Sequence, residues 1–457
     1  MLRPPFYHFW YDLSFEFNAF ENYVTDSNEC VRFKLVTCID DLIEDFDDTK
    51  VLGHKQDGES KKLVSSSCRI APFKPDMTYQ FFGENENIFG YKDLTVKVYY
   101  SCAQLNIYLC LKYADRLTKQ QTDGIEPDDV LKIIASKYET KVCYNLNEFS
   151  ANLSKEQSFM PYGELMEEFE IETKPTDDHQ QAQKRHFCLF KANNSVPGFV
   201  AYHERMQTFL MWFIEGASYI EIDDDHWDFF VLYEKLPFIG SQSSKPLLKE
   251  YQYCFVGYST VYRYYAYPQN VRPRISQFLI LPSFQRIGLG SKLLASIYTN
   301  YNNKSIVDIT VEDPSDDFQR MRDIYDCKLS IQLNWYKTLA PNTVWSNEMA
   351  REAQMKFKLN PKQTRRVFEI LKLKLTNRND PEQYRQYRMG IKQRLNAPYK
   401  KQINDIERLR QRKAISETNY TLLMKTNQIP REYRIKNLNK QYEEIESEYL
   451  QIIEKLG

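Results

Sequence analysis

The feature that most constrains the fold is the stretch SQFLILPSFQRIGLGSKLL at residues 276–294. An apolar run from Phe278 to Leu281 ends at Pro282, and Gly288 and Gly290 follow one residue apart. The chain has only 14 glycines in 457 residues, so this close pair marks a backbone with a special conformational need. The pattern predicts a strand, a glycine loop and a helix that begins near residue 288.

The glycine loop is suited to hold an anion at the start of that helix. Unpaired N–H groups and the positive end of the helix dipole lie there, and glycine lets the backbone approach a phosphate closely. Residues Gln285 to Ser291 are therefore a candidate cradle for a pyrophosphate, although a tight strand–helix turn would give the same pattern. The G-x-G-x-x-G fingerprint is absent because position 293 is leucine, and no G-x-x-x-x-G-K motif is present.

Composition excludes several classes of protein. The net charge of −1 gives no overall preference for nucleic acid or membranes, and no run of 18 apolar residues suggests a membrane span. The nine cysteines include no C-x-x-C pair, and His203 and His226 stand apart from any cysteine or histidine cluster. We therefore expect no metal site, no disulfide framework and a reducing compartment.

The pattern along the chain predicts four parts. Residues 1–80 form an N-terminal segment, partly flexible, with a polar insertion at 54–67. Residues 81–197 form an α+β domain, because DLTVKVYY and QLNIYLCLKY alternate like strands and Glu126-Pro127 is typical of the first turn of a helix. Residues 198–340 form an α/β domain, in which an apolar helix from Phe199 precedes strands DFFVLYEKL, YCFVGYSTVYRYYAYP, RISQFLILP and SIVDITV.

Residues 341–457 are predicted to be entirely helical. Asn360-Pro361 and Asp380-Pro381 each pair a cap residue with a proline at the first helical position. Apolar residues from Ile435 to Leu456 alternate at steps of three and four, which indicates a heptad seam. We expect this seam to pack within the chain as a hairpin; pairing with a partner is the alternative.

The glycine loop and its flanks resemble a known family. Gln285-x-x-Gly288-x-Gly290 after a strand resembles the acetyl-coenzyme A motif of the GNAT N-acetyltransferases. The stretches RPRISQFLILPSFQRIGLGSKLL, VDITVEDPS, YHERMQTFLMWFIEGASYIEIDDDHW and ENIFGYKDL look like the histone acetyltransferase type B catalytic subunit, over roughly residues 80–400. The resemblance implies a GNAT-type α/β (α+β) core that uses acetyl-CoA. It also implies a set of cofactor-binding residues: Phe278, Leu279, Ile280, Gln285, Arg286, Ile287, Gly288, Leu289, Gly290, Ser291 and, more weakly, Ser315.

Lysine acetylation needs a base near the acetyl group. A lysine amine has a pKa of about 10.4, so only roughly one in 10³ is neutral near pH 7. Glu312 follows the SIVDITV strand and resembles the family's base, whereas a surface carboxylate at a strand end is the alternative. Asp313 is a supporting candidate that we expect to cap a helix. Glu215, predicted to lie on an apolar helix face, is a second base candidate or else half of a buried ion pair.

The resemblance further implies a histone substrate and partners. Newly made histone H-four is the expected acceptor, and a WD-repeat histone chaperone is the expected partner, in the nucleus and cytoplasm. The candidate substrate-binding residues are Glu84, Asn85, Glu86, Tyr262, Arg263, Tyr264 and Trp227. No cysteine has a histidine companion in sequence, which favours direct transfer over a covalent intermediate. The alternatives are an acetyltransferase for a non-histone amine and a histone-binding scaffold.

Overall fold

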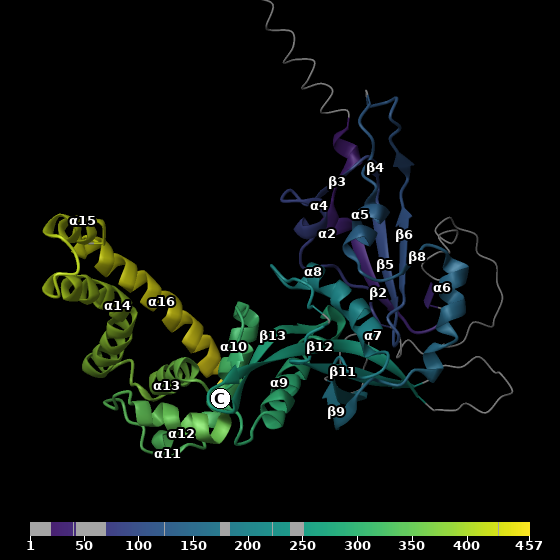
Figure 1. The fold of residues 1–457 in the computed structure, drawn as a ribbon. Coiled ribbons are helices and arrows are strands. Elements are labelled where there is room, and N and C mark those ends of the chain that lie inside the picture. The colour runs from purple at the N-terminus through teal and green to yellow at the C-terminus, as the bar shows by residue number, and fades with distance from the viewer. Residues whose placement is uncertain are drawn as a thin grey trace, which may run out of the picture. The chain divides into compact units, whose positions relative to one another are not determined.

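The computed structural model describes residues 20–39, 41–42, 70–122, 124–173, 183–221, 223–237, 251–427 and 429–457. The chain divides into two compact units: unit 1 spans residues 1–263 and 275–296, and unit 2 spans residues 264–274 and 297–457. Strand β13 (Asn270–Ile280) and helix α9 (Leu289–Asn300) each run from one unit into the other (Figure 1). The polar insertion expected at 54–67 lies outside the described residues.

A four-stranded sheet forms one layer of unit 1. Its order is β2-β5-β6-β8; β5 is antiparallel to β6, and the other two pairs are parallel. Strands β5 and β6 confirm the two strands predicted from DLTVKVYY and QLNIYLCLKY. The elements of this part are β1 (Val24–Asp26), α2 (Ser27–Cys30), β2 (Val31–Val36), α4 (Tyr79–Phe82), β3 (Asn87–Phe89), β4 (Tyr91–Lys92), β5 (Thr95–Ser101), β6 (Ile107–Lys112), β7 (Asp115–Arg116), α5 (Val130–Lys137), β8 (Val142–Cys143) and α6 (Leu146–Leu153).

The helix predicted to hold Pro127 in its first turn begins later. Helix α5 starts at Val130, and the side chain of Asp129 caps it by accepting a hydrogen bond from the backbone. Pro127 instead packs against Gly90, where an added Cβ would lie 2.4 Å from the proline Cβ. The carboxylate of Asp128 accepts a 2.7 Å hydrogen bond from the backbone N–H of the residue before Gly90. These contacts hold the chain beside β3, so the helix begins only at Val130.

A second, larger sheet has the order β14-β13-β12-β11-β10-β9. The three long strands predicted after residue 227 are confirmed, whereas β14 is much shorter than the predicted SIVDITV strand. Strand β10 pairs antiparallel with both β9 and β11, so this ladder joins residues on both sides of the boundary expected at 197. The strands not yet given are β9 (Glu164–Thr173), β10 (Gln183–Ala192), β11 (Trp227–Pro237), β12 (Tyr251–Ala266) and β14 (Thr310–Val311).

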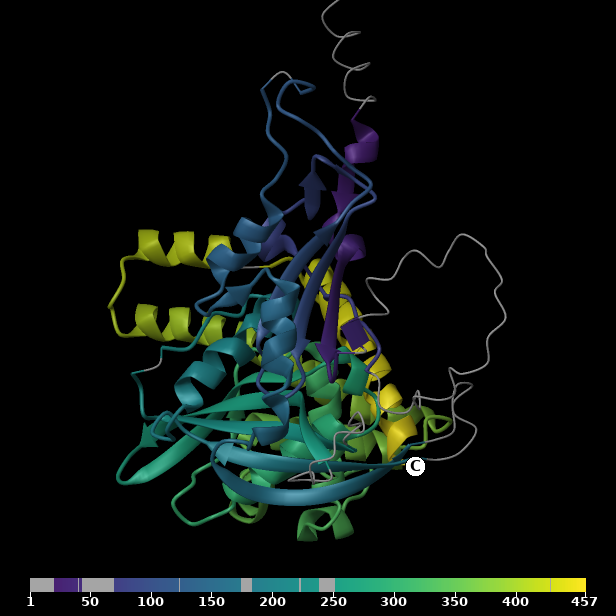
Figure 2. The same cartoon turned by 90° about the vertical axis from the view of Figure 1, so that its right-hand side faces the viewer.

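An aromatic helical layer packs between the two sheets of unit 1. Helices α7 (Phe199–Met206) and α8 (Leu210–Phe213) flank one turn of 3₁₀ helix and confirm the core helix predicted from Phe199. Phe209 stacks on Tyr100 of β5 at 4.2 Å and lies 5.8 Å from Phe255 of β12. Trp212 of α8 is fully buried. In Figure 2 the purple and blue strands of the small sheet run steeply across the teal strands of the large one.

Unit 2 is mainly helical, as predicted for residues after 341. Asn360 and Asp380 cap α13 and α14 through their side chains, with proline at the first helical position of each, which confirms both predicted helix starts. The helices are α10 (Asp316–Ser330), α11 (Asn334–Lys337), α12 (Asn347–Phe357), α13 (Pro361–Leu375), α14 (Pro381–Gln411), α15 (Glu417–Asn427) and α16 (Arg431–Leu456).

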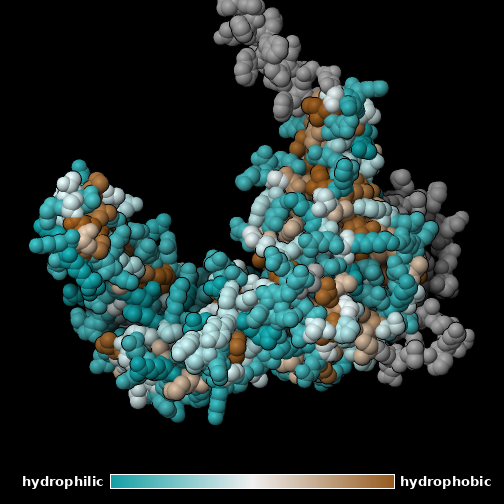
Figure 3. All heavy atoms as spheres, in the orientation of Figure 1, coloured by the Kyte–Doolittle hydropathy of each residue, from teal (hydrophilic) through white to brown (hydrophobic). Residues whose placement is uncertain are grey.

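The last helix packs within the chain along its C-terminal half. Helix α16 runs back along α14 and ends against α10 and α13 (Figure 1). Tyr442, Tyr449 and Ile452 of the predicted seam are buried there, which confirms the intramolecular hairpin for this half. Ile435, near the other end of α16, is 46% exposed. Figure 3 shows apolar atoms (brown) at the surface around α15, where Leu422 is also exposed.

Two features are absent from the described ranges. No helix among those residues has the length and apolarity needed to cross a membrane. Across the same ranges, no group of three or more His, Cys, Asp or Glu side chains is placed to hold a metal ion.

Candidate active site

Strand β13 passes very close to its neighbour β12 before the glycine loop. The N–H of Leu281 donates to the carbonyl of Val256 at 2.9 Å. A Cβ added at Gly257 would lie 2.2 Å from the carbonyl oxygen of Leu279 and 2.9 Å from the Cα of Ile280, so only glycine fits there. Leu279 and Ile280 bury their side chains, which leaves their main chain as the part available to a ligand.

The loop from Gln285 to Ser291 has the conformation of an anion cradle. Arg286 and Gly288 both have left-handed backbone, with φ of 66° and 94°, and the alternation of such residues turns successive N–H groups toward one side. Gln285, Arg286, Gly288 and Ser291 are exposed, while Leu289 is buried and anchors the start of α9. The first-turn amides of this 12-residue helix point out of the same loop. The loop therefore fits a pyrophosphate.

The side chain of Gln285 has a structural role in this loop. Its amide donates a 2.8 Å hydrogen bond to the carbonyl of Ile280, at the end of β13. This bond ties the loop back to the strand and leaves the backbone of Gln285 as the part that can face a phosphate.

Gly288 permits a direct test of the cradle. Alanine in left-handed backbone costs about 1–2 kcal/mol, so Gly288→Ala should weaken acetyl-CoA binding by roughly tenfold with little change in kcat. Isothermal titration of acetyl-CoA measures the loss. Gly124→Ala introduces the same strain at φ 103° away from the loop and should leave the affinity unchanged. Equal affinities for wild type and Gly288→Ala would contradict the cradle.

Glu312 stands directly after β14 and beside β13. Its carboxylate lies 3.6 Å from the guanidinium of Arg274 on β13, and its side chain is 45% exposed. The pairing holds the carboxylate on one side of the strand while leaving it open to solvent. Sequence reasoning missed Arg274, although a basic residue at the start of the predicted strand RISQFLILP is a usable signal.

The expectation that Asp313 caps the next helix is wrong. Ser315 is the cap of α10: its hydroxyl accepts a hydrogen bond from the N–H of Phe318 at 3.3 Å. Asp313 is exposed and has a φ of 29°, and Pro314 and Ser315 separate it from the helix start at Asp316. Ser315, a weak cofactor candidate, thus has a local structural role.

The prediction that Glu215 lies on an apolar helix face is also wrong. Helix α8 ends at Phe213, and Glu215 is exposed in the turn that follows. Gly216 in this turn has a φ of 65° and donates its N–H to the hydroxyl of Tyr79 at 3.1 Å. The carbonyl of nearby Ser218 accepts a hydrogen bond from Gln277 of β13, so the turn lies beside this strand.

The three N-terminal substrate candidates differ in their surroundings. Glu84 and Asn85 are exposed in the turn after α4. The carboxylate of Glu86 instead accepts a 2.7 Å hydrogen bond from the backbone of Thr78, which lowers the pKa of Glu86. Glu86 therefore holds the turn together, and Glu84 and Asn85 are the residues free to meet a ligand.

The candidates on β11 and β12 form two local groups. In unit 1, the rings of Trp227 and Tyr262 meet edge to face at 4.9 Å. Arg263 donates to the carbonyls of His226 and Asp225, so its guanidinium is used within the protein. In unit 2, the Arg274 guanidinium lies over the ring of Tyr264 at 5.3 Å.

Unit 1 contains an acidic hollow. It has a volume of about 420 Å³ and is lined by Glu139, Tyr219, Ile220, Glu221 and Asp223. A buried glutamine, Gln207, braces it by donating to Glu139 at 3.3 Å and accepting from the backbone of Ile220. The run of acids after Tyr219 was visible in the sequence, but the contribution of Glu139 depends on the fold.

The buried cysteines in the described residues are poor nucleophiles. All eight described cysteines are free, and six of them are buried. Burial raises the pKa of the Cys30 and Cys188 thiols to about 12, and desolvation also raises the pKa of Cys254. A thiol with a raised pKa carries little thiolate near neutral pH, so none of these groups is suited to accept an acetyl group.

Two family models match the chain. "Histone acetyl transferase HAT1 N-terminus" matches residues 23–215, and "Histone acetyltransferase type B catalytic subunit, C-terminal" matches residues 322–373. The strand, the anion cradle and Glu312 lie between these two segments. Together with the fold, the matches define an acetyltransferase that takes acetyl-CoA as its co-substrate.

Curated relatives carry the same name. The histone acetyltransferase type B catalytic subunits of Rattus norvegicus and Homo sapiens are each 38% identical over 389 residues, which cover 85% of this chain and 88% of the relative. That of Mycosarcoma maydis is 30% identical over 80% of this chain and 86% of its own. The chain belongs to the histone acetyltransferase type B catalytic subunit family, as the resemblance indicated.

Proposed function

We propose that the protein acetylates lysines of newly made histone H-four by direct transfer, with Glu312 as the general base. Glu312 first removes the ammonium proton, directly or through a water, and the neutral amine then attacks the thioester carbonyl carbon of acetyl-CoA. The C–N bond forms as the C–S bond breaks, and the CoA thiolate leaves and takes up the proton that the amine loses. The cradle from Gln285 to Ser291 holds the pyrophosphate, and the main chain of Phe278 to Ile280 holds the pantetheine arm.

The observation that carries the proposal is the ion pair between Glu312 and Arg274, because Arg274 lies on β13, the strand that leads into the cradle. Arg274 lies only four residues before Phe278 on this strand. A carboxylate that is half exposed and held by one cation can accept a proton and release it to solvent. Asp313 and Glu215 are both exposed carboxylates, and Asp313 remains a candidate for a supporting role and Glu215 a second candidate for the base.

The acidic hollow supports a basic peptide as the acceptor. Three carboxylates, from Glu139, Glu221 and Asp223, line one hollow together with the Tyr219 ring. Lysine and arginine side chains of a histone tail carry the complementary charge, and their stems suit an aromatic wall. Glu84, Asn85 and the Trp227–Tyr262 pair supply further surface for an extended tail.

The partner and the location follow from the family alone. We propose a WD-repeat histone chaperone as a stoichiometric partner that presents histone H-four with its dimer partner, in the cytoplasm and nucleus. Leu422, Tyr433 and Ile435, which are exposed apolar residues around α15 and the start of α16, offer a surface in unit 2 for such a partner.

A panel of acceptors tests the proposal. The full chain is incubated with acetyl-CoA and tails of each core histone, and acetyl groups are mapped by mass spectrometry. We expect acetyl groups on the tail of histone H-four well ahead of the others. Preferred transfer to another histone tail or to a small amine would contradict the substrate, and acetyl-CoA binding without transfer to any acceptor would favour the scaffold.

A further inference from the structure

The buried face of helix α10 is polar rather than apolar. Arg322, Asp323 and Asp326 are 3%, 0% and 0% exposed, and they lie on the face that α10 turns toward α13. Burying charges is costly, and a well-packed apolar core of the same volume is often equally stable or more so. A gain in stability therefore explains this arrangement poorly, and the charges are better explained by holding a neighbouring segment of the chain in place.

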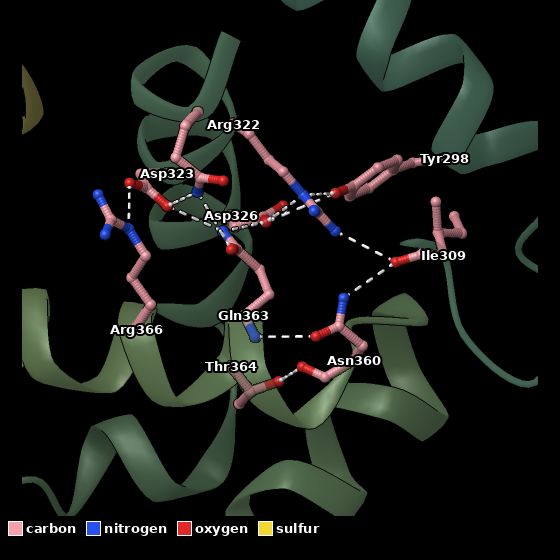
Figure 4. A network of polar contacts seen from close by, with 10 residues as sticks. Tyr298, Ile309, Arg322, Asp323, Asp326, Asn360, Gln363, Thr364 and Arg366 are labelled. Carbon is pink, nitrogen blue, oxygen red and sulfur yellow. Dashed lines mark hydrogen bonds and ion pairs between the residues drawn. The ribbon is translucent and has the colours of Figure 1, made fainter. Parts of the chain in front are cut away.

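The charges form one connected network (Figure 4). Gln363 of α13 donates to both aspartates at 2.9 Å. Arg366 pairs with Asp323 at 2.7 Å and lies on the far side of the acidic pair from Arg322. Arg322 lies 3.4 Å from Asp326 and donates a 3.0 Å hydrogen bond to the hydroxyl of Tyr298. The two guanidinium groups thus flank the same pair of carboxylates.

Only one of the two guanidinium groups reaches the segment that carries Glu312. Arg322 donates to the carbonyl of Ile309 at 3.1 Å, and Asn360 donates to the same oxygen at 3.3 Å. The N–H of Ile309 donates in turn to the carbonyl of Lys358 at 2.8 Å. Both backbone groups of Ile309 are therefore fixed by unit 2, three residues before Glu312.

A neighbouring contact secures the same segment from its other side. Asp308 is 2% exposed and pairs with Arg272 of β13 at 2.6 Å, and Gln354 of α12 donates to it at 3.3 Å. Since β14 has only two residues, the ladder itself gives little support. Three side chains of the helical region, those of Arg322, Gln354 and Asn360, thus add to the backbone and strand contacts that hold the approach to Glu312.

We propose that Arg322 is a positioning residue: by holding the Ile309 carbonyl within the buried network, it sets the place of the Glu312 carboxylate for proton removal from the acceptor amine. This inference rests on the proposed role of Glu312 as base. It gives the C-terminal helices a part in catalysis through main-chain position, without contact between Arg322 and either substrate.

Two matched variants test the proposal. Arg322→Lys keeps a positive charge near Asp326 but cannot donate to both Tyr298 and Ile309, whereas Arg366→Lys perturbs the same network without reaching Ile309. A displacement of the order of 1 Å can cost about 10²-fold in rate, so we expect Arg322→Lys to lower kcat at least tenfold with unchanged KM for acetyl-CoA. Arg366→Lys should lower the unfolding midpoint comparably and leave kcat within about twofold.

A gentler variant covers the case in which Arg322→Lys fails to fold. Asn360→Ser keeps a hydroxyl that can cap α13 but is too short to reach Ile309. Its kcat should fall several-fold at an unchanged KM for acetyl-CoA. Wild-type kcat in Asn360→Ser and Arg322→Lys, or equal loss in Arg322→Lys and Arg366→Lys, would overturn the positioning role.

A double variant separates this inference from the proposed function. If Arg322 acts through Glu312, Arg322→Lys should slow Glu312→Gln by less than about twofold, because the group it positions is gone. Independent losses that multiply in the double variant would overturn the positioning role and leave the base intact. Full activity of Glu312→Gln alone would overturn both.

Discussion

Replacing Glu312 by glutamine should lower kcat by about 10²- to 10³-fold, the usual range for loss of a general base. The amide has nearly the shape of the carboxylate but cannot take the proton from the acceptor ammonium. Acetyl-CoA affinity should stay within about twofold, because the cradle at residues 285–291 does not include Glu312. Steady-state rates with a tail of histone H-four and titration of acetyl-CoA give the two readouts.

The pH dependence of this variant sharpens the test. Without a base, transfer depends on the small fraction of neutral lysine, which grows tenfold per pH unit below a pKa of about 10.4. The rate of Glu312→Gln should therefore rise more steeply above neutral pH than the wild-type rate, for which Glu312 supplies the neutral amine. Asp316→Asn removes an exposed carboxylate at the start of α10 and should behave as wild type. A normal rate in Glu312→Gln, with a large loss in Glu215→Gln, would transfer the role to Glu215.

The second large effect is expected at Gly257. Its added Cβ would lie 2.2 Å from the Leu279 carbonyl, so Gly257→Ala must push β12 and β13 apart. Overpacking of this kind costs about 1–3 kcal/mol, and here it displaces the main chain proposed to hold the pantetheine arm. We expect a lower free energy of unfolding together with at least about tenfold weaker acetyl-CoA binding.

Gly390 provides the matched control for this substitution. It lies in helix α14 with nothing within 4 Å of an added Cβ, and its φ is not left-handed. Gly390→Ala should stabilise the protein by about 0.5–1 kcal/mol through helix propensity and leave acetyl-CoA binding unchanged. Denaturant unfolding and titration of both variants measure the pair of effects. Unchanged stability and affinity in Gly257→Ala would contradict the close passage of the two strands.

The parts of the fold that were predicted correctly follow from local sequence patterns. The strand at 278–281, the glycine loop and α9 follow from an apolar run and two glycines within 13 residues. The cap–proline pairs at Asn360 and Asp380 predicted their helix starts because capping depends only on adjacent residues. The same holds for the alternation that predicted β5 and β6.

The misplaced features depend on contacts between distant residues. Pro127 is drawn out of α5 by Gly90, and the turn at Glu215 is held by Tyr79, 137 positions away from its hydrogen-bonding partner Gly216. Strand β9 is rich in glutamate, yet it pairs with β10 at the sheet edge. No local pattern reports such partners.

The residues of the candidate site also divide into those that a local motif identifies and those that only the fold brings together. The cradle residues are contiguous, so a motif found them, whereas Glu139 reaches the acidic hollow only through the fold. Arg322 was hidden because charged residues on a helix are usually solvated, and here they form the buried face. Gly257 left a usable signal, a glycine inside the predicted strand YCFVGYSTV, which is typical of a close backbone approach.

The central claim is direct transfer from acetyl-CoA to a lysine of histone H-four, and the mass of the enzyme during turnover tests it most directly. The full chain is mixed with acetyl-CoA alone, and the tail of histone H-four is added afterwards. We predict that no hydroxylamine-labile acetyl group forms on the enzyme before the tail is added, and that each acetyl group then appears on a tail lysine. A labile acetyl-enzyme that forms without the tail and disappears at the turnover rate on its addition would contradict the account.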